Sequence, residues 1–166
     1  MESKKKFIML VGLPYSGKSY LIKTLGFEGV VVSSDQIILD YAQATGKSYN
    51  DVFKEFVDEA QRKATEEAIK AFKENKDVCI DQTNLTKASR RRKLALVPKD
   101  YEKVCIVVMS PTPVELEKRM NERQTHRIPL SVLENMQKVY QKPMLDEGFD
   151  VIYYAGFDDI VVTKES

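Results

Sequence analysis

The feature that most constrains this chain is the segment 12–19, which reads GLPYSGKS. It satisfies the pattern G-x-x-x-x-G-K-[ST] and stands between an apolar run of strand length, residues 7–11, and a helix-forming stretch, residues 18–25. Strand, glycine loop and helix in this order are the context in which the pattern binds phosphate groups. The segment therefore predicts an α/β fold with a site for the phosphates of a nucleotide.

Each residue type in this loop has a physical reason. Glycines allow backbone N–H groups to converge on phosphate oxygens, and a helix that begins near Lys18 presents its positive end to them. Lys18 is expected to reach the β- and γ-phosphates, and the hydroxyl of Ser19 is expected to ligate Mg²⁺. The predicted nucleotide-binding set comprises Gly12, Tyr15, Ser16, Gly17, Lys18, Ser19, Tyr20, Arg119 and Arg123.

Strand and helix patterns alternate along the rest of the chain. Short apolar runs predict strands at residues 7–11, 29–32, 78–80, 103–109 and 150–154. Helical patterns separate them at residues 35–45, about 50–75, 86–96, 113–124 and 130–141. Strands separated by helices indicate a parallel sheet with both faces covered. We therefore predict a three-layer α/β sandwich of the P-loop NTPase type, with a parallel sheet of about five strands and a helical lid. We expect one domain over residues 1–166, a basic tail at 1–6 and the lid at about 119–129.

Composition excludes several classes of protein. The chain is 43% hydrophobic and 31% charged, and no apolar run approaches the ~20 residues of a membrane span, so no membrane role is expected. Residues 1–13 carry lysines before an apolar run, but they lack the length and cleavage site of a signal peptide. Cys79 and Cys105 stand in β-branched runs and are predicted to be buried thiols, which favours a reducing, cytoplasmic location. His126 is the single histidine, so no transition-metal site or Cys/His nucleophile is expected.

Residues just after each strand are candidates for chemistry, because ligands bind at the carboxyl ends of the strands in such sheets. Asp35 follows the second predicted strand, within the sequence SSD. A carboxylate there can accept a hydrogen bond from an attacking hydroxyl and aim it at the γ-phosphate, which makes Asp35 the predicted general base. Aspartate is also a preferred helix cap, but the glycine loop upstream favours the catalytic interpretation.

The sequence DQTN follows the third predicted strand at residues 81–84. Asp81 can hold Mg²⁺ through water, as a Walker-B aspartate does, or it can pair with a mobile arginine, and both interpretations stay open. Thr83 and Asn84 are equally well explained as acceptor contacts or as a polar turn that caps the next helix. The predicted acceptor-binding set comprises Asp35, Asp81, Thr83, Asn84 and Arg127.

Basic residues gather in two further places. Arg119 and Arg123 are four apart on one predicted helix, hence on one face, and with Arg127 they are expected to neutralise charge on the transferring phosphate. The alternative is a solvated face on which Glu115 pairs with Arg119. The run RRRK at residues 90–93 is predicted to be mainly a solvated helix face, because consecutive residues point around a helix.

Together, the motifs GLPYSGKS, SSD, DQTN and RMNERQTHRIPLSVLENMQKVY resemble the kinase domain of the 5′-hydroxyl polynucleotide kinases, including the phage polynucleotide kinase/phosphatase and bacterial RNA-repair kinases. The likeness runs over about residues 7–140. It implies ATP or another nucleoside triphosphate as donor, Mg²⁺ as cofactor, and the 5′ end of a nucleic acid as acceptor. The residues to which it assigns catalytic roles are Lys18, Asp35 and Arg123, and the residue that it assigns to the metal is Ser19.

One position departs from that family's pattern. Three residues after the motif aspartate, the family has an arginine that binds the phosphate of the acceptor, whereas this chain has Ile38. A neutral branched side chain cannot replace a bidentate phosphate clamp. Positive charge for the acceptor would then have to come from Lys87 or from residues 90–92.

Two relatives keep other functions open. Seryl-tRNA kinases resemble this chain in the same motifs and phosphorylate a serine attached to RNA. The nucleotide-binding module of the hnRNP U proteins is similar in DQTN followed by RRK and in an uncharged residue at the place of Ile38, but it lacks the aspartate that Asp35 supplies here. A Mg²⁺-dependent polynucleotide 5′-kinase is therefore the leading hypothesis. A kinase of a nucleoside, nucleotide or other small molecule, and a non-catalytic nucleotide- and RNA-binding module, are the alternatives.

Overall fold

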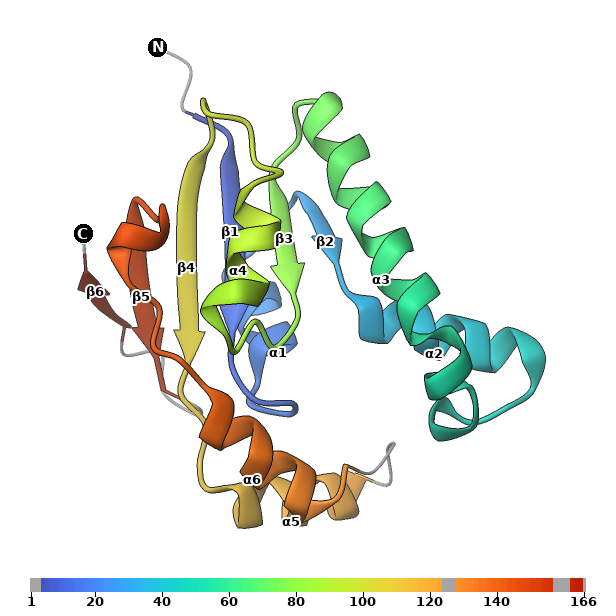
Figure 1. Ribbon diagram of the computed structural model, residues 1–166. Helices are drawn as coiled ribbons and strands as arrows, with labels where there is room; N and C mark the ends of the chain where they lie inside the picture. Colours follow the sequence, from blue (N-terminus) through green and yellow to red (C-terminus); the bar gives the residue numbers. More distant parts are fainter. Residues whose placement is uncertain (1–3, 124–127, 157–161, 166) are drawn as a thin grey trace.

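A six-stranded sheet forms the centre of the protein, whose computed structural model describes residues 4–123, 128–156 and 162–165 (Figure 1). The strands lie in the order β2-β3-β1-β4-β5-β6. Their bounds are β1 (Lys6–Val11), β2 (Val30–Val32), β3 (Val78–Asp81), β4 (Glu102–Val108), β5 (Val151–Ala155) and β6 (Val162–Glu165). Neighbouring strands from β2 to β5 are parallel, which confirms the predicted parallel sheet of five strands.

The sixth strand is a difference from the sequence-based expectation. β6 pairs antiparallel with β5, with Tyr154 opposite Thr163. It is only four residues long, and its sequence VTKE has strand character only through its first two residues. A short edge strand of this kind adds one ladder to the sheet without changing the order of the five parallel strands.

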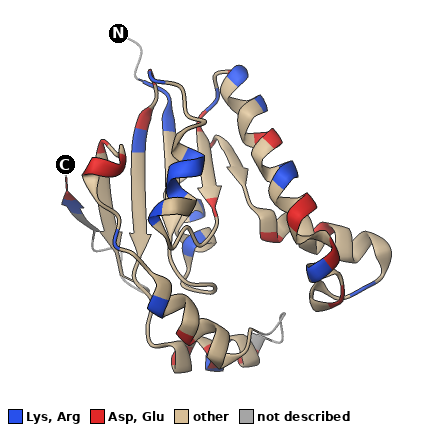
Figure 2. Cartoon of the chain, viewed as in Figure 1, with Lys and Arg blue, Asp and Glu red and all other residues tan. Residues whose placement is uncertain are grey.

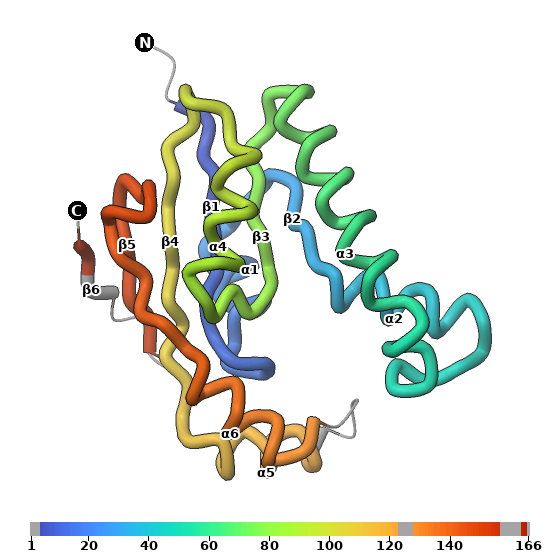
Figure 3. The backbone as a smooth tube through the Cα atoms, in the orientation of Figure 1, coloured from blue at the N-terminus to red at the C-terminus, as the bar shows by residue number. Residues whose placement is uncertain are grey.

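Helices cover both faces of the sheet, as predicted for a three-layer sandwich (Figures 1 and 3). The helices are α1 (Lys18–Thr24), α2 (Ser34–Thr45), α3 (Tyr49–Lys73), α4 (Lys87–Leu94), α5 (Pro113–Arg123) and α6 (Leu130–Val139), and a 3₁₀ turn follows at Leu145–Glu147. On one face, α1 packs Leu21 and Ile22 against Ile8 and Leu10 of β1. The opposite face carries α3 and α4.

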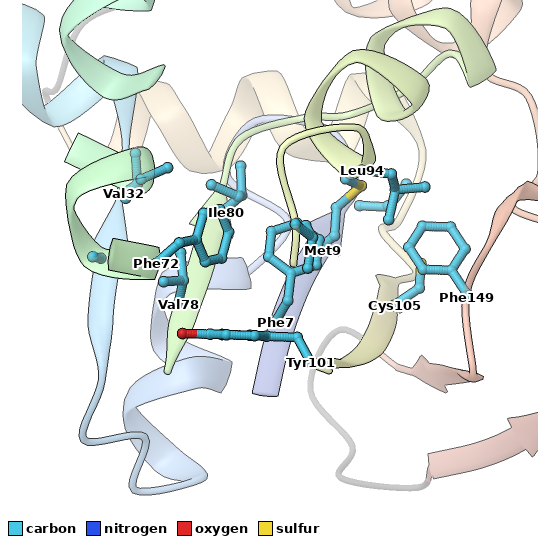
Figure 4. Packing of buried hydrophobic residues seen from close by; sticks show 14 of the residues in the cluster. Phe7, Met9, Val32, Phe72, Val78, Ile80, Leu94, Tyr101, Cys105 and Phe149 are labelled. Atoms are coloured by element: carbon cyan, nitrogen blue, oxygen red, sulfur yellow. The ribbon is translucent and has the colours of Figure 1, made fainter. Parts of the chain in front are cut away.

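The α3/α4 face holds the larger hydrophobic core (Figure 4). Phe72 of α3 and Leu94 of α4 pack in the same cluster as Phe7 and Met9 of β1. Side chains that alternate along a strand point to opposite faces, and β1 is apolar from Phe7 to Val11 because both of its faces are covered there. The predicted burial of the two cysteines, Cys79 and Cys105, is also confirmed.

The long helix α3 has two packing partners. Its C-terminal half covers the sheet, whereas its N-terminal half continues past the sheet and packs against α2 (Figure 3). The α2–α3 contact is built from small and apolar side chains, namely Ile38, Ala42, Val52, Phe56 and Ala60. Ser48 is the N-cap of α3 and forms a capping box with Asp51, which satisfies two backbone N–H groups at the start of the helix.

A second helical pair, α5 and α6, lies beyond the carboxyl ends of the strands (Figure 1). Leu116 and Met120 of α5 and Leu133 of α6 are fully buried against Leu13 and Leu85, which follow β1 and β3. The two pairs, α2–α3 and α5–α6, therefore stand on either side of the loop that follows β1. Within the described part of the chain, none of the helices has the length and apolar character that crossing a membrane requires.

Candidate active site

The glycine loop after β1 adopts a conformation that its sequence requires. A Cβ at Gly12 would lie 2.8 Å from the carbonyl oxygen of Val108 and 2.9 Å from Oγ of Ser16, so only glycine fits there. Gly17, with φ 96°, is the residue from which α1 begins. Tyr15 also has positive φ, at 61°, and its side chain packs against the buried cluster of α5 and α6. Packing on the α5–α6 pair thus holds the unfavourable backbone conformation at Tyr15 in place.

Two polar groups inside this loop fit phosphate. The hydroxyl of Ser16 is buried and has no hydrogen-bond partner among the described residues. Nζ of Lys18 is nearly buried and donates to the carbonyl oxygens of Gly12 at 3.0 Å and Leu13 at 2.7 Å. Burial lowers the pKa of Lys18 to about 8, although Asp81 and Asp35 both act to raise it. A buried donor and a desolvated ammonium are groups that a phosphate would satisfy.

Ser19 and Asp81 meet at the edge of the loop. Oγ of Ser19 donates to Oδ2 of Asp81 at 2.5 Å, so the first helix and the end of β3 share one polar contact. Hydroxyl and carboxylate oxygens are the ligands that Mg²⁺ prefers. The described residues hold no group of three or more His, Cys, Asp or Glu side chains placed to bind a metal. This pair therefore fits a Mg²⁺ that takes most of its ligands from phosphates and water.

Asp35 lies in the first turn of α2 but does not cap that helix. Ser33 is the N-cap, and its hydroxyl accepts from the backbone N–H of Gln36 at 3.2 Å. The carboxylate of Asp35 instead accepts a hydrogen bond of 2.7 Å at Oδ1 from the phenol of Tyr49, the first residue of α3. Burial, followed by this hydrogen bond, raises the pKa of Tyr49 well above its usual range. The phenol stays protonated, so Asp35 has a fixed orientation.

A cleft of about 800 Å³ opens beside Asp35. Its walls come from the glycine loop, α2, α3, the loop after β3, α4 and α6. The lining residues are Pro14, Ser34, Asp35, Ile38, Tyr49, Asn50, Phe53, Lys54, Val57, Gln61, Thr65, Gln82, Thr83, Asn84, Ser89, Arg92, Lys93, Leu96, Ile128, Pro129, Val132 and Met136. This volume is in the range of small-molecule and cofactor sites.

The loop after β3 shapes one wall of the cleft. The carbonyl of Thr83 accepts from the backbone N–H of Gly12 at 3.0 Å, which ties this loop to the glycine loop. Asn84 is buried with φ 49°, and its Nδ2 donates to the carbonyl of Leu10 at 2.7 Å, while Oδ1 accepts from Nζ of Lys93. Both ends of the Asn84 amide are therefore used within the protein, which makes it a positioning group for the loop.

The basic run of α4 corrects one expectation. Arg90 is fully buried, whereas a solvated face was predicted for most of this run. Nε of Arg90 donates to Oε1 of Glu147 at 2.8 Å, and its other nitrogens donate to the carbonyls of Asn84 and Gln141, each at 2.8 Å. The available signal was Leu94, which lies one turn further along the same face of the helix and is also buried.

The arginines predicted for the lid are placed only in part. Nε of Arg119 donates to Oε1 of Glu115 at 3.1 Å, which is the i,i+4 pair considered as its alternative role. Arg123 is the last residue of α5, but its side chain lies outside the described part of the chain, as does the whole of Arg127. Tyr20, on α1, is 75% exposed.

The structure also brings in residues that sequence reasoning did not select. Tyr49 is one of them, and no spacing rule connects it to Asp35, fourteen residues earlier. Lys93 was grouped with a solvated face, yet it lines the cleft. Ile38 is only 1% exposed and belongs to the α2–α3 core, so the position of the family's acceptor arginine carries a core residue here.

Known proteins share this fold and parts of this sequence. The L-seryl-tRNA(Sec) kinase of Methanococcus maripaludis is 27% identical over 147 residues, which are 87% of this chain and 56% of that relative. This chain thus spans about half the length of that curated relative. Among solved structures, a chain of the Pnkp1/Rnl/Hen1 RNA repair complex is similar with a TM-score of 0.62 at 23% identity, over 83% of this chain and 44% of that one. A gluconokinase from Sinorhizobium meliloti is similar with a TM-score of 0.55 at 15% identity, over 95% and 86% of the two chains.

The structural likenesses establish the fold, and a family match adds to them. Residues 7–143, which are most of the chain, match the family AAA_33, described as an AAA domain. The matched residues include the glycine loop, all but the first residue of β1 and the whole of β2, β3 and β4, together with α5 and α6. The chain therefore belongs to the AAA_33 family, and its fold is that of a P-loop kinase domain.

Proposed function

We propose that this protein is a Mg²⁺-dependent phosphotransferase that moves the γ-phosphate of ATP, or of another nucleoside triphosphate, to the 5′-hydroxyl end of RNA or DNA. One observation carries the proposal. Asp35 lines a cleft that the glycine loop also lines, and its charge acts on the ammonium of Lys18 in that loop. A carboxylate so placed can face an acceptor hydroxyl on one side and the donor phosphates on the other.

The donor side of this site would be held by the glycine loop. Lys18 and Ser16 provide an ammonium and an unpaired hydroxyl for phosphate oxygens. Ser19 and Asp81 would hold Mg²⁺, which when bound neutralises charge on the β- and γ-phosphates. Arg119 and Arg123, both on α5, would add guanidinium groups from the lid side.

The acceptor side would be organised by Asp35. In the transfer, the acceptor oxygen forms a bond to the γ-phosphorus, the bond from the γ-phosphorus to the bridging oxygen breaks, and the nucleoside diphosphate leaves with that electron pair. The proton of the acceptor hydroxyl passes to Asp35. Because the transition state of phosphoryl transfer is loose, orientation of the hydroxyl contributes more than early removal of its proton. Tyr49 occupies Oδ1, so we assign the acceptor hydroxyl to Oδ2.

A nucleic acid acceptor is favoured by the charge of the cleft and by the relatives. The cleft is lined by three cationic residues, Lys54, Arg92 and Lys93, and by one carboxylate, Asp35. The curated relative is named for an aminoacylated tRNA substrate, and one structure of similar fold belongs to an RNA repair complex. The names of these relatives support an acceptor that carries phosphates. The charge of the cleft supports the same acceptor, since a positive cleft binds polyanions.

A kinase of a small molecule is the second candidate. It is favoured by Ile38, because the described part of α2 places a buried apolar side chain where the polynucleotide kinases carry a phosphate-binding arginine. An uncharged acceptor such as a nucleoside or a sugar would not need that clamp.

Transfer of radiolabel from γ-labelled ATP tests the two candidates against each other. The panel contains 5′-hydroxyl RNA and DNA oligonucleotides, seryl-tRNA, free nucleosides and small sugars. We expect label on the oligonucleotides, abolished by Asp35→Asn and kept by Asp40→Asn, an exposed carboxylate of the same helix outside the cleft lining. Label only on small molecules would contradict the polynucleotide kinase proposal. Tight ATP binding with no labelled product from any acceptor would instead point to a binding module.

A further inference from the structure

Lysine and arginine residues colour much of α4 blue in Figure 2, but the residues of its basic run have different environments. Arg90 is buried and its charge is neutralised by Glu147. Arg91 is exposed and does not line the cleft. Arg92 and Lys93 both line the cleft that holds Asp35. Only the last two residues of the run are therefore available to a ligand beside Asp35.

Lys93 is held in the cleft wall by neutral groups. Its Nζ donates to Oδ1 of Asn84 and to Oγ of Ser89, the latter at 3.4 Å. No carboxylate pairs with Lys93 within the described residues. Burial, and then the charge of Arg92, lower the pKa of Lys93 to about 8. A desolvated ammonium without a counter-charge is stabilised by an anion that enters the cleft.

Polar residues without formal charge share the cleft lining with Lys93. A small recess next to the cleft is lined by Gln61 and Thr65 of α3, by Gln82 and by Lys93, and its other lining residues are apolar. The same four residues also line the cleft itself. Amide and hydroxyl groups can donate hydrogen bonds to an anion without opposing its charge. The cleft wall that contains Lys93 thus offers neutral hydrogen-bond donors to an oxyanion.

The opposite wall supplies one further cation. Lys54 of α3 lines the cleft on the side of Tyr49 and Phe53. The α2 wall has Ile38 in the hydrophobic core and Asp35 as its charged residue in the lining. Positive charge around the acceptor therefore comes from α4 and α3, and α2 contributes the carboxylate.

We propose that Lys93 and Arg92, with Lys54 across the cleft, form a subsite for the phosphate that is linked to the nucleoside carrying the acceptor hydroxyl. The inference rests on the proposed function and deepens it, because it moves the acceptor clamp from α2 to α4. The acceptor class that follows is a 5′-hydroxyl nucleotide chain whose first internucleotide phosphate is charged. Aromatic and apolar residues of the same cleft, such as Phe53 and Val132, would lie beside its base.

The test compares two 5′-hydroxyl oligonucleotides that differ only at the first linkage, which is a phosphodiester in one and an uncharged methylphosphonate in the other. We expect wild type to prefer the phosphodiester by about 10- to 100-fold in kcat/KM, as is typical for charge-assisted hydrogen bonds. Lys93→Gln and Arg92→Gln are expected to bring this ratio close to 1. Arg91→Gln is the matched control and should keep it. Lys93→Arg, which retains the charge, should restore most of the preference.

The ratio of the two kcat/KM values distinguishes loss of phosphate recognition from a general disturbance of the structure. A variant that merely disturbs the Asn84 loop lowers activity on both acceptors and leaves the ratio intact, and that result would overturn the proposal. Binding of both oligonucleotides is also measured by fluorescence anisotropy with a non-hydrolysable ATP analogue. If wild type transfers no phosphate but its binding shows the same ratio, lost in Lys93→Gln, the subsite stands and the kinase proposal falls. A binding ratio near 1 in wild type would overturn the subsite.

Discussion

The phenol of Tyr49, at the start of α3, donates a 2.7 Å hydrogen bond to Oδ1 of Asp35 in the first turn of α2. The two helices are packed through the buried core that includes Ile38 and Val52. This packing keeps donor and acceptor in register, because neither helix can rotate without breaking it. The α2–α3 pair therefore presents one carboxylate in a fixed orientation at the edge of the cleft.

Removal of the Tyr49 hydroxyl should slow the reaction without unfolding the site. We expect Tyr49→Phe to lower kcat by about 5- to 30-fold, since a hydrogen bond to a charged group contributes about 1–2 kcal/mol. The KM for ATP should change little because the Tyr49 hydroxyl is hydrogen-bonded to Asp35, on the proposed acceptor side of the cleft. Steady-state kinetics with saturating acceptor check this. Tyr41→Phe is the matched control: its ring stacks on Phe56 at 3.9 Å, outside the cleft lining. An unchanged kcat in Tyr49→Phe would show that Asp35 does not depend on this bond.

The affinity for nucleotide should fall at alkaline pH because of Lys18. Its pKa in the free protein is about 8, and bound phosphates favour the ammonium, so the complex holds a proton that the free protein loses above pH 8. We expect the Kd for ATP to rise by about tenfold per pH unit above that point. Lys18→Arg should bind more weakly at neutral pH but without this dependence, because a guanidinium does not deprotonate.

Lys93 provides the control for this pH dependence. Its pKa is also lowered to about 8, but it lies on the acceptor side of the cleft. Calorimetric titrations with ATP, in the absence of acceptor, should therefore give the same alkaline loss of affinity in Lys93→Gln as in wild type. A Kd that stays constant up to pH 9.5 in wild type would remove Lys18 from the phosphate site.

The backbone of segment 12–19 could be predicted from the sequence more fully than the walls of the cleft, for a physical reason. The segment 12–19 is a local motif, in which strand, turn and helix dictate one another within a few residues. The acceptor side is assembled from contacts far apart in the chain. Tyr49 reaches Asp35 only because α2 and α3 pack together, and Lys93 reaches the cleft only because α4 lies over β3.

The run of basic residues on α4 shows the same limit of sequence-based prediction. Three arginines and a lysine in a row on a helix read as a solvated face, and Arg91 does lie on the surface. Arg90 does not, since Glu147, far along the chain, neutralises it inside the protein. The sequence contains both charges but no periodicity that links them. The parallel direction of strands β1 to β5, by contrast, could be predicted, because alternating strands and helices allow few other arrangements.

Disruption of the Ser19–Asp81 pair should change the Mg²⁺ concentration that phosphoryl transfer requires. We expect Asp81→Asn to raise the Mg²⁺ concentration needed for half-maximal phosphoryl transfer by about 10- to 100-fold, as is typical when a carboxylate around a metal ligand is lost. Magnesium titrations at saturating ATP measure this shift. Binding of ATP in EDTA is the control, because a general defect of the loop would appear there as well. Equal magnesium requirements in the variant and wild type would leave Asp81 to the alternative role, pairing with an arginine.

Loss of the buried Arg90 charge should destabilise the fold far more than loss of its exposed neighbour. Arg90 joins Glu147 to the carbonyls of Asn84 and Gln141, so its removal leaves the Glu147 carboxylate without its cation and two backbone carbonyls without a donor. We expect Arg90→Met to lower the free energy of unfolding by about 3–5 kcal/mol, whereas Arg91→Met should change it by about 0.5 kcal/mol or less. Urea denaturation followed by circular dichroism measures both, provided that the m-values agree.

The double variant Arg90→Met, Glu147→Met should recover part of the loss, because no charge is then left buried alone. If the two single arginine variants unfold at the same urea concentration, the Arg90 network does not hold the loop after β3 in place.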